Sequence, residues 1–176
     1  RLDENVPAWP VPKVLRLTDK DGRFDRALAE GVVINTASVL TIEDWVDALE
    51  WAKSIGGLKS LIGRTDANYT ALAAWVEKTA WIDFLPQRED IRSTTSVCLK
   101  FTDERVSALD DKAQKAFVKG FKALLEGEGA VYDMEPHRNA PPGLRLWCGC
   151  TVETADVVAI FPWLEWAFET AVSEIG

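Results

Sequence analysis

Apolar residues recur at helical spacing between residues 41 and 76 and predict two consecutive helices. The first begins near Thr41, because Thr41 and Asp44 have the spacing of a capping box, and it ends at Gly56-Gly57. Its apolar positions are Ile42, Trp45, Val46, Leu49 and Ala52. The second helix carries Leu58, Leu61, Ile62, Leu72, Trp75 and Val76 on one face. Two such helices in succession predict a bridge that packs against structure outside the chain.

The segment before these helices shows no long periodic pattern. The prolines between Val6 and Pro12 exclude a helix or a central strand and predict an extended connector. Residues 18–22 have the composition of a turn. Residues 31–34 predict a short strand-like run that ends at Asn35-Thr36.

After about residue 81 the pattern changes. Residues 93–101 predict a strand, and Asp110 is placed to cap a helix that ends at Gly127 and Gly129. Short strands are predicted at 130–134 and 144–148, and a last helix from about Thr154, which Pro162 should bend or delay. This order of elements over residues 81–176 predicts an α+β fold, a small antiparallel sheet with helices on one face. The apolar stripe of the middle helix is Phe117, Val118, Phe121, Leu124 and Leu125.

Composition narrows the class of protein. A chain of 176 residues is one domain, or one domain plus a piece of another. Its net charge of −8 argues against nucleic acid or an anionic membrane as the main partner. No apolar run approaches the roughly 20 residues of a membrane span. The start at Arg1 has neither an initiator Met nor an apolar signal core, so we expect the chain to begin within something larger.

The cysteines and the single histidine predict neither a disulfide framework nor a metal site. Cys148 and Cys150 form a C-x-C pair, but one His in the chain leaves too few partners for zinc. We expect reduced thiols in a cytoplasmic protein.

The residues with the strongest candidate chemistry lie between Glu135 and Arg145. His137, Arg138 and Arg145 gather in a proline-stiffened loop of an acidic chain, and they predict an anion-binding site for a carboxylate or phosphate. The alternative is that the arginines pair with surface carboxylates such as Asp133 and Glu135.

A second, weaker candidate is Asn35-Thr36. Short polar side chains and backbone N–H groups just before a helix can bind phosphate. Such a pair is more often only a turn and an N-cap. The sequence contains no glycine-rich phosphate loop, no metal-ligand spacing and no Ser/His/Asp arrangement.

An ordered set of short motifs resembles the C-terminal half of phosphoserine aminotransferase, a pyridoxal-phosphate (PLP) enzyme. The motifs are Trp9-Pro10-x-Pro12-Lys13, Ile34-Asn35-Thr36, Ser54-Ile55-Gly56-Gly57-Leu58, Arg92-Ser93-Thr94-Thr95-Ser96-Val97 and His137-Arg138 followed by Gly143-Leu144-Arg145. The resemblance implies a parent of α/β, fold-type I architecture that works as a homodimer. Residues 1–80 would be the end of the large PLP-binding domain with its bridging helices, and residues 81–176 the small C-terminal domain.

The resemblance also implies an activity, the transfer of an amino group between phosphoserine and 2-oxoglutarate in serine biosynthesis, and in some bacteria a part in pyridoxine synthesis. Asn35 and Thr36 match residues that reach the PLP phosphate of the partner subunit. Arg145 matches the arginine that binds the α-carboxylate of the substrate, and His137 and Arg138 match the pair that holds its phosphate. In the branch of the family best known for this His-Arg pair, the interval between the histidine and the carboxylate-binding arginine is one residue shorter than the interval from His137 to Arg145 here.

The resemblance places the Schiff-base lysine, the aromatic residue that stacks on PLP and the aspartate at its pyridinium nitrogen upstream of Arg1. We therefore expect no catalytic residue in this chain and no activity from the chain alone. Two alternatives stay open. One is a non-catalytic α+β module that binds an amino acid or phosphate for regulation, and the other is a different fold-type I PLP enzyme.

Overall fold

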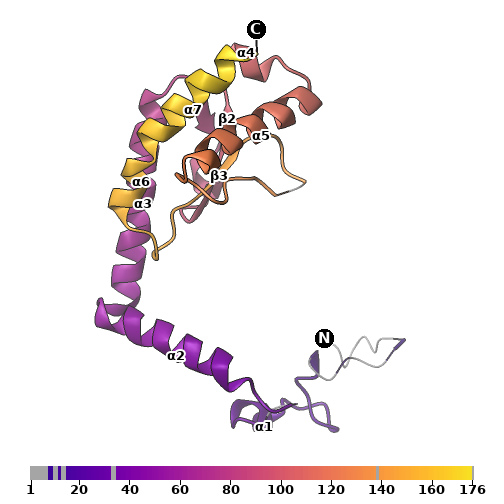
Figure 1. Cartoon of the computed structure of the whole chain (residues 1–176). Helices are drawn as coiled ribbons and strands as arrows, with labels where there is room; N and C mark the ends of the chain where they lie inside the picture. Colours follow the sequence, from indigo (N-terminus) through magenta and orange to yellow (C-terminus); the bar gives the residue numbers. More distant parts are fainter. Residues whose placement is uncertain (1–7, 10–11, 13–14, 33–34, 138, 176) are drawn as a thin grey trace. The chain divides into compact units, whose positions relative to one another are not determined.

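The computed structural model describes residues 8–9, 12, 15–32, 35–137 and 139–175. The chain divides into two units, Arg1–Trp51 and Ala52–Gly176, which are described separately. Figure 1 labels most of the helices and strands along the chain. Among the described helices, none is long and apolar enough to cross a membrane.

The first unit contains a tight turn and a one-turn helix. Thr18 and Phe24 pair in an antiparallel bridge, and Asp19 Oδ1 accepts hydrogen bonds from the backbone N–H groups of Asp21 and Arg23 at 2.8 and 3.0 Å. These contacts confirm the predicted turn. Helix α1 (Arg26–Ala29), which the sequence pattern did not predict, follows an Asp25 cap. Most of the predicted connector, and two of the four residues of the predicted strand at 31–34, lie outside the described residues.

The two predicted helices are α2 (Val39–Ser54) and α3 (Gly57–Lys78). The predicted capping residue of the first helix, Thr41, is wrong by three residues. Ser38 caps it instead, because Ser38 Oγ accepts from the N–H and the hydroxyl of Thr41 at 3.4 and 3.0 Å. The predicted break at the glycine pair is confirmed, since Gly56 and Gly57 have φ values of +109° and +69°, which side chains rarely tolerate.

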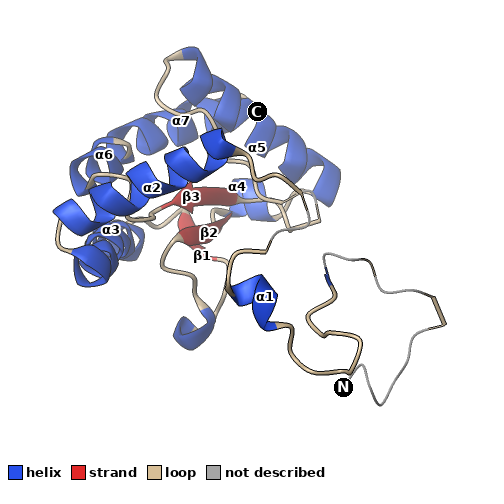
Figure 2. Ribbon diagram, turned by 90° about the horizontal axis from the view of Figure 1, so that it is seen from below, coloured by secondary structure: helices blue, strands red, loops and turns tan. Residues whose placement is uncertain are grey.

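The second unit contains a three-stranded antiparallel sheet in the order β1-β2-β3. The strands are β1 (Ile82–Phe84), β2 (Ser96–Phe101) and β3 (Leu144–Trp147). Alternate residues of each strand are buried on one face of the sheet. Figure 2 shows the red strands beside helices α5, α6 and α7 of this unit, and core residues of these helices pack with the buried face of the sheet, so the predicted α+β fold with helices on one face is confirmed.

The helices that cover the sheet are held by an aromatic and aliphatic core. Helix α5 (Asp111–Gly127) is capped by Asp110, whose carboxylate accepts from the N–H of Ala113 at 2.7 Å. The predicted last helix is divided at Ile160 into α6 (Thr154–Ala159) and α7 (Phe161–Ser173), with Pro162 in the first turn of α7, where proline is well tolerated. The rings of Trp81 and Phe168 stack at 4.2 Å in the middle of this core.

A buried asparagine joins α3 to the turn that follows β3. Asn68 is fully buried, and its Nδ2 donates to the carbonyl oxygens of Cys148, Gly149 and Val152 at 3.3, 3.2 and 3.0 Å. Its Oδ1 accepts from the hydroxyl of Thr154 at 2.6 Å. Beside it, Arg64 Nε donates to the carbonyl of Cys150 at 2.7 Å, and its guanidinium pairs with Glu153 and lowers the pKa of that carboxyl. This polar network fixes the chain at the end of β3.

One local prediction for the second unit is wrong, and several short elements were not predicted. Residues 130–134 do not form a strand. The backbone there makes one hydrogen bond to β3, from the N–H of Arg145 to the carbonyl of Met134 at 2.9 Å, and a single bond is too little for a ladder. The pattern also missed β1 and the short helices η2 (Glu89–Ile91) and α4 (Glu104–Ser107). The division at residue 80 concerns the domains of a longer parent and stays a prediction, while α3 itself belongs to the second structural unit.

Candidate functional site

Arg145 lies on the face of the sheet that the helices leave uncovered. It stands in the middle of β3, and its Cα is paired with that of Cys98 on β2. Leu144 and Leu146 on either side are buried in the core, so the alternation of the strand turns Arg145 and Trp147 to the opposite face. Its side chain is 39% exposed, which leaves the guanidinium accessible to a ligand.

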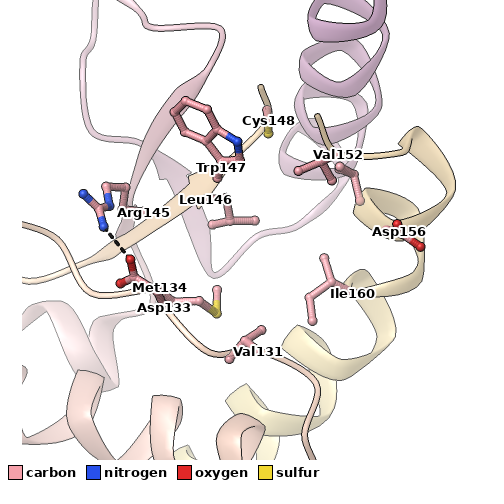
Figure 3. A pocket seen from close by; sticks show the side chains of 11 residues that line it. Val131, Asp133, Met134, Arg145, Leu146, Trp147, Cys148, Val152, Asp156 and Ile160 are labelled. Carbon is pink, nitrogen blue, oxygen red and sulfur yellow. Dashed lines mark hydrogen bonds and ion pairs between the residues drawn. The ribbon is translucent and has the colours of Figure 1, made fainter. Parts of the chain in front are cut away.

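The guanidinium of Arg145 pairs with Asp133. Arg145 Nη2 donates to Asp133 Oδ2 at 2.9 Å, the dashed line in Figure 3. The pairing with a nearby carboxylate, which was the alternative for this arginine, is thus present. Glu135 makes a different contact, since Lys122 Nζ donates to its carboxylate at 2.7 Å and lowers the pKa of Glu135.

A cavity of about 160 Å³ lies beside this ion pair, between β3, the segment 131–134 and α6. Figure 3 shows an apolar floor with Asp133 and Arg145 on one side and Asp156 on the other. Trp147 borders the cavity and is 57% exposed. Its indole lies so close to Gly149 that an added Cβ there would stand 2.4 Å from the ring. The residues that line the cavity are Val131, Asp133, Met134, Arg145, Leu146, Trp147, Cys148, Val152, Asp156, Val157 and Ile160.

His137 lines a second cavity, of about 260 Å³, together with Lys115 and Lys119 of α5. The structure therefore places His137 and Arg145, which the sequence grouped in one loop, at two different cavities. The Nδ1 atom of His137 accepts from the backbone N–H of Asn139 at 3.2 Å. This contact leaves the proton of the neutral ring on Nε2, so that atom can donate to an anion.

The remaining predicted site residues are placed as follows. Arg138 lies outside the described residues. Asn35 and Thr36 are exposed residues of the first unit, just before α2. A side-chain amide, a hydroxyl and the backbone N–H groups there are donors that suit the phosphate group of PLP. Asn35 and Thr36 suit only the phosphate group of PLP, because neither side chain can stack on the pyridine ring or form a Schiff base.

Cys148, the cysteine that lines the cavity beside Arg145, is a poor nucleophile. Cys98, Cys148 and Cys150 are free thiols. Burial raises the pKa of Cys148 to about 11, so this thiol stays protonated near neutral pH. Among the described residues, no group of three or more His, Cys, Asp or Glu side chains could hold a metal ion.

Two features of the site were missed by sequence reasoning. The first is Trp147, which the period-two alternation of β3 places on the face of Arg145, two residues away. That signal was present once the strand was recognised. The second is the separate cavity of His137, which depends on where α5 packs and has no local signal in the sequence.

Comparison with known proteins supports the fold and the family. No family model matches the chain. It is 44% identical to a phosphoserine aminotransferase of Methanosarcina mazei and 46% identical to that of Methanosarcina barkeri, in each case over 96% of its length. The chain spans only 43% and 42% of the length of these two relatives. A solved structure of phosphoserine aminotransferase, from a study of radiation damage to its Schiff base, shares the fold with a TM-score of 0.65 at 15% identity, over 82% of this chain and 37% of that chain.

The three-stranded antiparallel sheet with helices on one face is the α+β fold that this chain shares with the solved structure. Together with the identity over nearly its full length, this fold shows that the chain belongs to the phosphoserine aminotransferase family and corresponds to a C-terminal portion of it.

Proposed function

We propose that this chain supplies the substrate-binding small domain of a PLP-dependent enzyme, a homodimer that transfers an amino group between phosphoserine and 2-oxoglutarate. The observation that carries the proposal is the identity of 44–46% to phosphoserine aminotransferases over 96% of the chain. The accessible guanidinium of Arg145 is in keeping with it, because both amino-acid substrates carry an α-carboxylate.

In this proposal Arg145 binds the α-carboxylate through charge-assisted hydrogen bonds from its planar fork. His137 donates from Nε2 to the phosphate group of phosphoserine, and Arg138 is assigned to the same group from sequence. Asn35 and Thr36 bind the phosphate of PLP in the partner subunit. PLP, when bound, supplies the electron-withdrawing ring on which transamination depends. The residues of this chain bind and orient substrate and cofactor, and they take no proton from the reacting carbon.

The test is made in the complete enzyme, meaning a polypeptide that spans the full length of the relatives and contains this chain. Arg145→Ala should lower kcat/KM for phosphoserine by about 10- to 100-fold or more, because a charge-assisted hydrogen bond contributes about 1.5–3 kcal/mol. Arg88→Ala is the matched control, since Arg88 is also paired with a carboxylate, Asp90, on the surface. A near-normal kcat/KM for Arg145→Ala would show that the carboxylate assignment is wrong.

The choice of substrate is tested separately. The complete enzyme should use phosphoserine far better than serine, because only phosphoserine has a second anionic end. Comparable kcat/KM values for the two would favour a different fold-type I PLP enzyme.

A third experiment uses the 176-residue chain by itself. We expect it to show no stable, stoichiometric visible absorbance band with PLP and almost no heat of binding with phosphoserine, because the resemblance places the Schiff-base lysine elsewhere. Tight binding of phosphoserine or of a free amino acid in calorimetry would instead favour the regulatory module.

A further inference from the structure

Asp133 contacts Arg145 through its side chain, and its neighbour does so through the backbone. Asp133 Oδ2 accepts from Arg145 Nη2 at 2.9 Å, and the carbonyl of Met134 accepts from the backbone N–H of Arg145 at 2.9 Å. The segment therefore fixes both the strand position and the head group of this arginine. The neighbouring carboxylate, Glu135, pairs with Lys122, so its charge is already matched.

The geometry of the guanidinium leaves room for a second carboxylate. A guanidinium has five N–H donors in one plane. Asp133 occupies a single nitrogen, Nη2, and the side chain of Arg145 remains 39% exposed. Arg145 can therefore keep its bond to Asp133 while another edge of the fork receives a ligand.

We propose that Asp133 is a positioning residue, which holds the guanidinium of Arg145 in the orientation that binds the α-carboxylate of the substrate. This inference rests on the proposed function. An arginine side chain that is already held loses less rotamer freedom when the substrate binds, so affinity improves without any new contact to the substrate. Asp133 itself need not touch the substrate.

The opposite effect, repulsion between Asp133 and the substrate carboxylate, is the weaker of the two. The side chain of Asp133 is 72% exposed, so water and salt screen its charge effectively. A hydrogen bond at 2.9 Å restricts the arginine whether or not that charge is screened. Removing the carboxylate should therefore weaken substrate binding and not strengthen it.

The test compares Asp133→Ala and Asp133→Asn in the complete enzyme, with Asp90→Ala as the matched control. Asp90 is an exposed carboxylate paired with an arginine, Arg88, at a different place on the second unit. The measurements are kcat and KM for phosphoserine and for glutamate, and the inhibition constant of O-phosphoethanolamine. This inhibitor has the phosphate and the amine of phosphoserine but no α-carboxylate, so its binding does not involve Arg145.

We expect Asp133→Ala to raise KM for both amino acids roughly threefold to tenfold, the range for releasing one long side chain. The value of kcat should stay within about twofold, and the inhibition constant of O-phosphoethanolamine should not change. Asp133→Asn should keep KM close to the wild-type value, because its amide oxygen still accepts a hydrogen bond from Arg145. Asp90→Ala should behave like the wild type.

Three results would overturn this role for Asp133. The first is an unchanged KM in Asp133→Ala. The second is a lower KM in either variant, which would show that Asp133 competes with the substrate for Arg145. The third is a parallel rise in the inhibition constant of O-phosphoethanolamine, which would indicate general damage to the site. In an enzyme that transaminates phosphoserine and depends on Arg145, such results would leave the proposed function intact. A wild-type enzyme without that activity would overturn the proposed function as well.

Discussion

At Gly143 the backbone that leads into β3 lies against β2 with no space for a side chain. A Cβ at this position would stand 2.2 Å from the carbonyl oxygen of Leu99, a backbone atom that cannot move aside alone. Leu99 pairs with Leu144, the first residue of β3. The glycine is therefore required by a close approach of two strands, and it allows the register that turns Arg145 to the uncovered face.

Substituting this glycine should separate the strands at their first pair. We expect Gly143→Ala to lower the free energy of unfolding of the chain by about 2 kcal/mol or more, because the clash is with backbone. Gly120→Ala is the control, since Gly120 lies within α5 and a Cβ there meets nothing within 4 Å. That change should raise stability by about 0.5–1 kcal/mol, as alanine favours a helix over glycine. Denaturant unfolding of both variants measures the difference, and equal effects would exclude the close approach as the reason for Gly143.

At the scale of single residues, the sequence identified the chemistry of the site but not its geometry. The sequence indicated Arg145 as an anion-binding residue because its guanidinium lies in a proline-containing loop, and the residue types alone were enough for this prediction. Its pairing with Asp133 remained one of two alternatives, because the two residues are twelve positions apart and meet only when residues 131–134 lie beside β3. His137 was grouped with Arg145 by nearness in sequence, yet it lines another cavity.

At the scale of elements, the polar network around Asn68 ties helix α3 to the end of β3. The four hydrogen bonds of its buried amide satisfy three carbonyl groups and one hydroxyl that have left water. The three carbonyl groups belong to the turn between β3 and α6, which lines the cavity beside Arg145, and the hydroxyl belongs to the first residue of α6. The packing of α3 therefore also decides how the strand of the site ends.

Removing the amide of Asn68 should lower the free energy of unfolding more than a typical substitution on the surface does. We expect Asn68→Ala to lower the free energy of unfolding by about 2–4 kcal/mol, because buried partners lose their hydrogen bonds and a cavity remains. Asn139→Ala, at an exposed position, should change it by less than about 0.5 kcal/mol. Chemical denaturation monitored by far-UV circular dichroism compares them. A loss below about 1 kcal/mol in Asn68→Ala would mean that water replaces the amide.

The elements themselves were predicted well where the pattern was long. Helices α2, α3 and α5 have strong periodicity, a polar residue able to cap, or glycines at the end, and each of these signals acts within a few residues. Strand β1 has three residues and was missed, because so short a strand is stabilised only by its pairing with β2. Residues 130–134 have the composition of a strand, but only Met134 bonds to β3.

At the scale of the whole molecule, α2 has no buried residue and presents an apolar face to solvent. Ile42, Trp45 and Leu49 on this face are 44%, 67% and 52% exposed. Contiguous apolar surface of this kind is rare on monomeric proteins and is usually covered by a partner or by further chain. The assignment of this helix to a bridge in a longer protein stays a prediction.

We expect the 176-residue chain to self-associate through this face, and Leu49→Lys to shift it toward monomer. Asp44→Lys introduces the same side chain about 140° around the helix, on the polar face, and should leave association unchanged. Sedimentation equilibrium over a range of concentrations measures both. If both variants associate as strongly as the wild type, the interface lies elsewhere.

The sequence by itself determined the class of fold, the presence of the long helices, and the residue types able to bind an anion, because periodicity and side-chain chemistry act over short distances along the chain. Only the tertiary structure decided that helices leave the face of Arg145 and Trp147 uncovered, that Asp133 meets Arg145, and that His137 lines a separate cavity. These facts depend on packing between segments that are remote in sequence, where register and close approach, and not local preference, select the contacts.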